Sequence, residues 1–396
     1  MGGPLAQARR GQCSTTGSTV KCRGGSFRAP GHVVLGGRRM TGPVIISTDF
    51  HTRHRRQRGV AMIVALLMVA TLSFIALGLT QSMTRSVHRA AASAAYSNVY
   101  WQAISARTVG EIALRAVLDG AQRDGGKLTP SHPLFLAPVD LPLATGTARV
   151  QFADATRCFN INSLVVGPGD DADDADDASG NGENVGKRNA AAVREFTLLA
   201  TSIGLSEARA QRIANVIADW LDSDAEQGFG GAEDGFYLGL PSPFRTGTGQ
   251  IADVSELRAM DGMSQQIYRG LKPYLCAHPV SLPSKVNINM LRPQDAPVLS
   301  ALLGGQLGVQ EAVSLIEARP PEGWDSIAAF WAAPSLEAVD YDEATRAQRT
   351  SITSGYIEIA ATISDREVDL EQRLVYEIGA TSDRARLVKR TFGGDE

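Results

Sequence analysis

The sequence predicts an α+β chain with three parts: a long N-terminal helix that begins in a membrane, an antiparallel sheet, and a large helical domain inserted into that sheet. Three observations support this prediction. Residues 60–80 are apolar and uncharged, the C-terminus contains three segments of alternating polarity, and a short motif between them occurs twice. The 39 Lys and Arg against 42 Asp and Glu argue against a strongly basic nucleic-acid scaffold.

The apolar segment Val60–Thr80 has 21 residues and no charge. At about 1.5 Å per residue, a helix of this length crosses the hydrocarbon of a bilayer. Four Arg lie in the preceding HTRHRRQRG, and the next charge is Arg85. Because positive flanks stay in the cytoplasm, we expect a single-pass membrane protein with a cytoplasmic N-terminus and an exported C-terminal region.

The residues just before the apolar segment resemble a processing signal. A secretory signal would have a shorter apolar core followed by its cleavage site. Here Arg58-Gly59-Val60 resembles the class III signal of type IV prepilins and pseudopilins, which a prepilin peptidase cuts after the glycine. The resemblance implies a leader of residues 1–59 and a mature chain that starts at Val60. Met40 would begin a leader of ordinary size, so residues 1–39 are either an upstream start-site artefact or a disordered tail.

The helix is expected to continue outside the membrane over residues 81–120, because Ser86–Leu118 lacks Pro and is rich in Ala. This part of the helix is predicted to be amphipathic, because it has an apolar stripe at steps of three and four, formed by Val99, Ala103, Ala106, Gly110, Ala113 and Val117. We assign residues 145–160 and 350–394 to the sheet, with the first segment read as one strand over 147–160. This combination resembles the pilin fold.

The insertion is predicted to contain two related helical units, residues 160–276 and 284–345. Each begins with the same motif, Asn-Ile-Asn with Leu two residues later, as FNINSL at 159–164 and VNINML at 286–291. Each then shows two helices separated by a Gly-Leu turn. These units resemble SAM-like or helix-hairpin-helix-like modules. DNA binding by such modules is the alternative function, as in a type IV pilus or competence minor pilin. The hairpins SIGLSE and LGGQLGVQ lack a tight Gly-x-Gly, and their acidic surroundings disfavour phosphate, so we expect no nucleic-acid partner.

Several motifs in order, CFNINSL, IADWLDSD, GGAEDGFYLGLPSPFRT, SELRAMDGM and LKPYLCA, resemble the K-type minor pseudopilin of type II secretion. The resemblance implies a non-enzymatic, methylated subunit that is anchored in the inner membrane with its C-terminal domain in the periplasm. It would lie at the tip of the periplasmic pseudopilus, start its assembly and support export of folded proteins. The implied partners are the I, J and H-type minor pseudopilins, the major pseudopilin, prepilin peptidase and the inner-membrane assembly platform. Val64, the fifth mature residue, also fits a tip subunit, because most pseudopilins have Glu there to pair with the subunit ahead.

Six carboxylates lie within residues 219–234, at a helix end and in a Gly-rich loop. Such oxygen-rich loops suit Ca²⁺, and the K-type resemblance implies calcium here with Asp222, Asp224, Glu233 and Asp234 in its motif. The alternative is a solvated acidic loop. The run of six Asp at 170–177 is predicted to be a self-repelling disordered loop.

Of the four cysteines, Cys13 and Cys22 lie in the leader, so Cys158 and Cys276 are the two left after processing. Since the periplasm is oxidising, we expect them to form a disulfide rather than remain as two separate thiols. The three His of the mature region are isolated, and no nucleophile, phosphate-loop or zinc-protease motif is present, so we expect no enzyme.

Overall fold

The computed structural model describes residues 60–123, 127–143, 145–166, 186–224, 226–365, 368–379 and 385–393, without the side chains at 122 and 123. The chain divides into two compact units, residues 1–75 and 76–396. Gly59, the rest of the leader and the Asp run at 170–177 lie outside the described residues.

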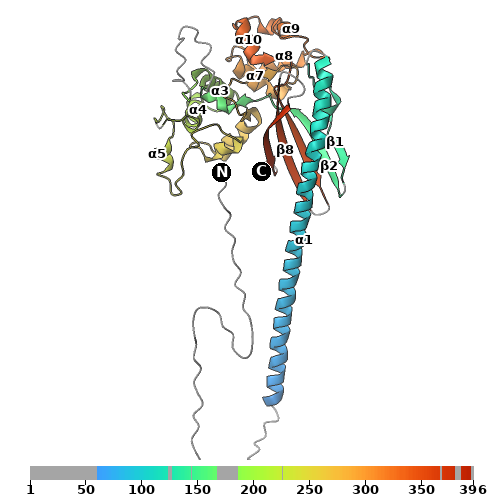
Figure 1. Ribbon diagram of the computed structural model, residues 1–396. Helices are drawn as coiled ribbons and strands as arrows, with labels where there is room; N and C mark the ends of the chain where they lie inside the picture. Colours follow the sequence, from blue (N-terminus) through green and yellow to red (C-terminus); the bar gives the residue numbers. More distant parts are fainter. Residues whose placement is uncertain are drawn as a thin grey trace, which may run out of the picture. The chain divides into compact units, whose positions relative to one another are not determined.

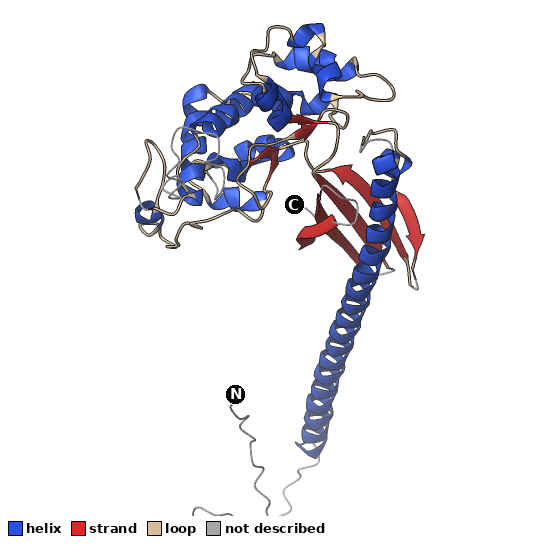
Figure 2. Cartoon of the chain, turned by 45° about the horizontal axis from the view of Figure 1, so that its top comes forward, coloured by secondary structure: helices blue, strands red, loops and turns tan. Residues whose placement is uncertain are grey.

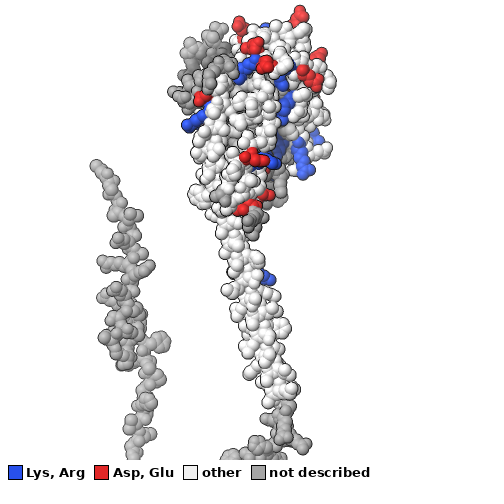
Figure 3. Space-filling model, turned by 90° about the vertical axis from the view of Figure 1, so that its right-hand side faces the viewer, with Lys and Arg blue, Asp and Glu red and all other residues white. Residues whose placement is uncertain are grey.

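Helix α1, Val60–Arg123, contains the predicted apolar segment (Figure 1). By length and composition it can cross a membrane, and its first part carries almost no charge in Figure 3. The few hydroxyls in this part bond back to the helix, as Ser73 does to the carbonyl of Val69 at 2.8 Å, so no side-chain polar group there requires water. α1 is therefore consistent with a single-pass membrane anchor.

The sheet has five antiparallel strands in the order β1-β2-β7-β8-β9. Their bounds are β1, Val139–Pro142; β2, Thr147–Asp154; β7, Tyr356–Ser364; β8, Asp369–Ile378; and β9, Ala385–Phe392. The outer half of α1 packs on one face, where Val99, Ala103 and Ala106 are buried, as the stripe predicts (Figure 2). Small side chains let the helix approach closely, and Gly110 lies against Ile359 of β7.

Two details of the sheet differ from the sequence prediction. Strand β1 and the short helix α2, Pro133–Leu136, are not predicted from the sequence. Pro138 directly before β1 and Pro142 at its end hide its strand character. The predicted strand 147–160 is broken after Asp154. The Asp154 carboxylate accepts the Thr156 backbone N–H at 2.8 Å, which turns the chain before β3, Phe159–Asn160.

Residues 155–166, 186–224 and 226–355 contain two successive helical segments, named the first and second helical units, and their buried apolar side chains share one core that is separate from that of the sheet. In the first unit the elements are η1, Ile161–Leu164; α3, Ala190–Ser202; α4, Glu207–Leu221; α5, Asp234–Tyr237; η3, Val254–Ala259; α6, Gln265–Leu271; η4, Lys272–Tyr274; and β4, Leu275–Cys276. In the second they are β5, Val286–Asn287; η5, Pro293–Asp295; α7, Ala296–Leu302; α8, Val309–Glu317; α9, Ile327–Trp331; η6, Pro334–Leu336; α10, Glu343–Arg349; and β6, Thr350–Ser351.

The two Asn-Ile-Asn motifs make matching contacts. Asn162 accepts the backbone N–H of Ile251 and donates to its carbonyl, and Asn289 does the same with Trp324. Each motif also starts with a short strand that pairs in parallel with the last strand of its unit, β3 with β4 and β5 with β6. Buried amides that satisfy a distant backbone group fix the loops of both units.

The two ends of the insertion meet at the sheet. The Ala155 N–H donates to the Tyr356 carbonyl at 3.0 Å, extending the β2–β7 ladder by one bond. Asp154 is buried and accepts hydrogen bonds from Thr156 at one end and from the Ser354 hydroxyl at the other. Burial raises the pKa of Asp154. The insertion therefore leaves and re-enters between two neighbouring strands.

Candidate functional site

Three buried carboxylates meet where helix α4 ends. Oxygen atoms of Asp219, Asp222 and Glu233 all lie within 4.8 Å of one another. Asp219 belongs to the last turn of α4, Asp222 is its C-cap, and Glu233 is the N-cap of α5. Because α4 is amphipathic and packs its apolar face into the unit, its end and the loop back from it are held against the core.

The Gly-rich loop is shaped around Asp219, which has no exposed surface. One oxygen of Asp219 forms an ion pair with Arg188, and the other accepts the Gly228 N–H at 3.2 Å. A Cβ at Gly231 would overlap the Asp219 carboxylate, so glycine is required there. Asn215 donates to the Phe229 carbonyl at 2.7 Å and fixes the tip of the loop.

The electrostatics of this group favour a cation. Burial first, and then the neighbouring Glu233, Asp224 and Asp219, raise the pKa of Asp222 to about 8. Burial and Asp219 likewise raise the pKa of Glu233. Asp222 also stands at the negative end of the α4 dipole, where a carboxylate is disfavoured. Arg188 forms its ion pair with Asp219. Among the described residues, Asp222 and Glu233 have no such ion pair with a Lys or Arg.

The structure brings together only part of the ligand set expected from the sequence. Asp222 and Glu233 belong to the group of three carboxylates. Its third member is Asp219, whereas the predicted ligands Asp224 and Asp234 are not part of it. Asp224 is exposed and accepts the Glu226 N–H at 2.8 Å. Asp234 accepts hydrogen bonds from the Thr246 N–H at 2.8 Å and from Arg245 at 2.7 Å. These bonds, the one from the Thr246 backbone first, lower the pKa of Asp234.

The oxygen donors fit a hard cation. Asp222 Oδ1 and Glu233 Oε1 are buried and have no hydrogen-bond partner among the described residues. Buried carboxylate oxygens without a partner are costly, and a bound Ca²⁺ would satisfy both. Asp222 and Glu233 would hold the ion, and Asp219, whose oxygens already accept two donors, would act on it by its charge.

Cys158 and Cys276, which the sequence predicts to pair, form a disulfide with their Cα atoms 5.6 Å apart. They lie at the parallel pair β3–β4, where Asn160 is opposite Cys276. The bridge therefore joins the strand that enters the first helical unit to the strand that leaves it. Of the predicted processing residues, Val60 is the first residue of α1, and Gly59 precedes the described chain.

Comparisons with known proteins agree on one family. Two family models described as "Type II secretion system (T2SS), protein K" match residues 157–280 and 286–353. Type II secretion system protein K of Pectobacterium carotovorum is 30% identical over 340 residues, 86% of this chain and 97% of the relative. The protein K of Dickeya chrysanthemi is 30% identical over 86% of this chain and 98% of its own length.

Among solved structures, the chain is similar to one in the crystal structure of the GspK-GspI-GspJ complex from the enterotoxigenic Escherichia coli type 2 secretion system. The TM-score is 0.64 at 26% identity, over 78% of this chain and 100% of that chain. The mixed helix-and-sheet fold is thus shared with that structure. The chain belongs to the type II secretion system protein K family and is a minor pseudopilin of that system.

Proposed function

We propose that this subunit caps the pseudopilus and starts its assembly, and that its role is structural rather than enzymatic. The observation that carries the proposal is the insertion of residues 155–355 between the neighbouring strands β2 and β7. A shaft of closely packed subunits leaves little room for a domain of this size. At the tip, such a domain has room because no subunit lies ahead of it. Val64 supports the same role, because a tip subunit has no neighbour ahead for a Glu to pair with.

Partners follow from this position. The solved complex of GspK with GspI and GspJ supports other minor pseudopilins as partners. We extend the proposal to an H-type minor pseudopilin and the major pseudopilin below, and to the inner-membrane assembly platform. The two helical units would be related SAM-like modules, an idea that the matching contacts of Asn162 and Asn289 support. The acidic surroundings of the first unit disfavour the DNA-binding alternative.

The cap proposal predicts one copy per filament. With a label attached within the insertion and pseudopili sheared from cells, imaging is expected to show about one label at one end. A label on the major pseudopilin is the matched control and should repeat along the shaft. Regular labelling of this subunit along the filament, or its efficient assembly into a filament alone, would contradict the cap role.

We also propose that prepilin peptidase cleaves between Gly59 and Val60, that the mature α-amino group is then methylated, and that the N-terminus faces the cytoplasm. Gly59→Leu should leave full-length precursor, because a side chain there obstructs the scissile bond. Gly78→Leu is the matched control, since a Cβ at Gly78 meets nothing within 4 Å. N-terminal sequencing and intact mass report the result, and normal processing of Gly59→Leu would refute the site.

Calcium is proposed as the ion held by Asp222 and Glu233. Free Ca²⁺ at 100 times its Kd should stabilise the fold by about 2.7 kcal/mol. Thermal melting of the detergent-purified chain, with Ca²⁺ and with chelator, measures this difference. Asp222→Asn should lose this response yet be at least as stable as the wild type in chelator, because it removes a repelled carboxylate. Glu226→Gln, an exposed acid in the same loop, should keep the response. A melting temperature indifferent to Ca²⁺ would remove the proposal.

A further inference from the structure

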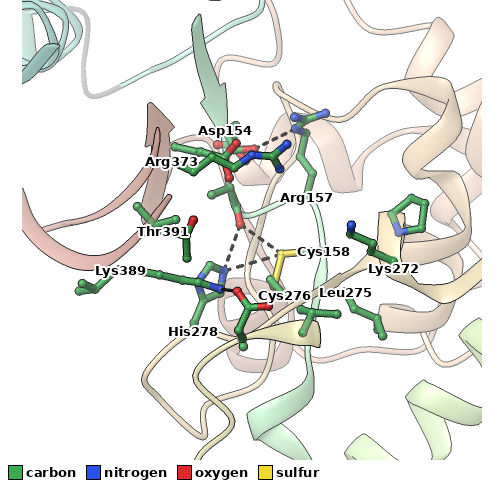
Figure 4. Close-up of a pocket in the computed structure, with 18 of the residues that line it drawn as sticks. Asp154, Arg157, Cys158, Lys272, Leu275, Cys276, His278, Arg373, Lys389 and Thr391 are labelled. Atoms are coloured by element: carbon green, nitrogen blue, oxygen red, sulfur yellow. Dashed lines mark hydrogen bonds and ion pairs between the residues drawn. A yellow bond between two sulfur atoms is a disulfide. The ribbon is translucent and has the colours of Figure 1, made fainter. Parts of the chain in front are cut away.

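The two cysteines of the disulfide share a cluster with one histidine. The sulfur atoms of Cys158 and Cys276 and a ring nitrogen of His278 all lie within 4.8 Å of one another. All three residues line a cavity of about 410 Å³ between the sheet and the first helical unit, and Figure 4 shows the imidazole ring beside the disulfide there. Two thiolates and an imidazole are ligands that suit Zn²⁺ in proteins, provided that the two sulfurs are not bonded to each other.

The backbone holds these three residues together independently of the S–S bond. Cys158 directly precedes β3, and Cys276 ends β4, the parallel partner of β3. The Asn160 side chain accepts the His278 backbone N–H at 3.1 Å, and the Asn162 side chain donates to the His278 carbonyl at 2.7 Å. Both amides are buried, so water competes little for these bonds. The cluster is therefore expected to persist in a chain whose cysteines are thiols.

His278 has the protonation state and the position of a metal ligand. Its ring stacks on Tyr356 of β7, with centroids 3.8 Å apart and planes 7° from parallel, which fixes the direction of its nitrogens. Nε2 lies 3.0 Å from the Ala155 carbonyl oxygen and 3.7 Å from Sγ of Cys158. Burial lowers the pKa of His278 to about 4, so the ring is neutral. A neutral imidazole with its proton on Nδ1 offers the lone pair of Nε2 to a cation.

The distances suit a tetrahedral ion. With Zn–S bonds of about 2.3 Å and Zn–N bonds of about 2.1 Å, sulfur and nitrogen ligands are about 3.6 Å apart. The separation between Sγ of Cys158 and Nε2 of His278 is 3.7 Å. Two sulfur ligands would be about 3.8 Å apart, and thiols on Cα atoms 5.6 Å apart reach that separation by rotation about their Cα–Cβ bonds. The Ala155 carbonyl oxygen, 3.1 Å from Sγ of Cys158, or a water from the cavity would complete the coordination.

The thiol form of the chain exists before the disulfide form. Cysteines are incorporated as thiols, and the S–S bond forms only after they reach an oxidising compartment. In this interval both sulfurs are available as metal ligands. Ca²⁺ does not compete for them, because it is a hard cation that takes oxygen ligands.

We propose that Cys158, Cys276 and His278 form a zinc site in the chain before its disulfide is made, and that disulfide formation expels the ion. Binding of Zn²⁺ releases the two thiol protons. A disulfide reagent, a small molecule or a protein, then takes two electrons from the two thiolates. The S–S bond forms between Cys158 and Cys276, the S–S bond of the reagent breaks, its two sulfurs take up two protons, and Zn²⁺ leaves.

The ion would join the same two strands that the disulfide joins later. Until oxidation, Zn²⁺ would clamp β3 to β4, the strands by which the chain enters and leaves the first helical unit. It would also occupy two thiols that otherwise react with other disulfides. The proposal concerns this chain alone and does not depend on the cap or calcium proposals.

The test uses the full chain in detergent, in a Cys13→Ser/Cys22→Ser background so that the leader supplies no thiol. The chain is reduced with a phosphine, which is then removed without air, and titrated with Co²⁺ as a coloured substitute for Zn²⁺. We expect one tetrahedral Co²⁺ per reduced chain, with a sulfur-to-cobalt charge-transfer band that Zn²⁺ abolishes. The oxidised chain should lack this band, because its sulfurs are bonded to each other, and Co²⁺ held by carboxylates does not produce it.

Release of the ion is measured on the zinc-loaded chain. Treatment with oxidised glutathione should free one Zn²⁺ per disulfide formed, as reported by a chromophoric chelator. Disulfide formation that leaves Zn²⁺ bound would contradict the expulsion step.

His278→Gln should weaken Co²⁺ binding by the reduced chain more than tenfold, since loss of even an outer-shell partner of a metal costs about 10–100-fold in affinity. His88→Gln, which changes an exposed histidine of α1, is the matched control and should bind as the unchanged chain does. Three results would overturn the site: no charge-transfer band in the reduced chain, equal affinity in His278→Gln, or a reduced chain that stays unfolded by circular dichroism at saturating Zn²⁺. The comparison of reduced and oxidised chains changes no residue of the cluster, so it stays decisive if His278→Gln fails to fold.

Discussion

Arg349→Ala is expected to lower the free energy of unfolding by about 3–5 kcal/mol, because it leaves a buried carboxylate unpaired. Arg349 of α10 forms two bonds to Glu195 of α3, at 2.5 and 3.0 Å, and both side chains are largely buried. The pair links the second helical unit to the first. Denaturant titration of the purified chain measures the loss.

The pH dependence of this effect has a definite sign. Burial raises the pKa of Glu195 to about 7, against an ordinary value of 4.5, so the folded state holds the proton more tightly than the unfolded state. This group therefore favours folding less as pH rises from about 4.5 to 7. Without Arg349 the pKa rises further, so the loss in Arg349→Ala should be larger at pH 8 than at pH 5.

Two controls separate burial from charge. Arg386→Ala, which removes an exposed ion pair with Glu377, should change stability little. Glu195→Leu combined with Arg349→Met should recover much of the loss, since it leaves no unpaired buried charge. A loss in Arg349→Ala no larger than that in Arg386→Ala would show that the buried pair contributes nothing.

The double variant Cys158→Ser/Cys276→Ser is expected to be less stable by several kcal/mol. The bridge closes a loop with a sequence separation of 118, for which the chain-entropy model gives about 4–5 kcal/mol. Unfolding of the non-reduced wild type and the variant in the same detergent gives the difference. Cys13→Ser/Cys22→Ser in the precursor is the matched control and should have no effect. A loss under about 1 kcal/mol in the first variant would contradict the clamp.

The sequence predicts those parts of the fold that depend on local pattern. The stripe through Val99 and Ala103 has helical spacing and is buried, and the three C-terminal segments alternate and form β7, β8 and β9. Strand β1 is missed because Pro138 before it and Pro142 at its end are residues typical of loops. The break after Asp154 is missed because the partner of that carboxylate, Ser354, is distant in sequence.

The acidic site is harder to predict for the same reason. Asp219 is a single charged residue in the apolar run IANVIADWL, and this is the feature of the sequence that indicates a special role for it. That role depends on the ion pair with Arg188, which is distant in sequence. Asp234 belongs to the motif by composition, yet Thr246 and Arg245 occupy its oxygens. Which carboxylates converge is decided by contacts across a loop, and a linear pattern does not show them.

The meeting of Ala155 and Tyr356 has a consequence for folding kinetics. Pairing β2 with β7 before the insertion is ordered would close a very long loop, at a large entropic cost. The helical units form more local contacts, such as α3 with α4 and α7 with α8, which bring their own ends together first. We therefore expect the insertion to fold early, and the sheet on which α1 packs to be completed last. During export, the sheet would then close only after the domain inserted in it has formed.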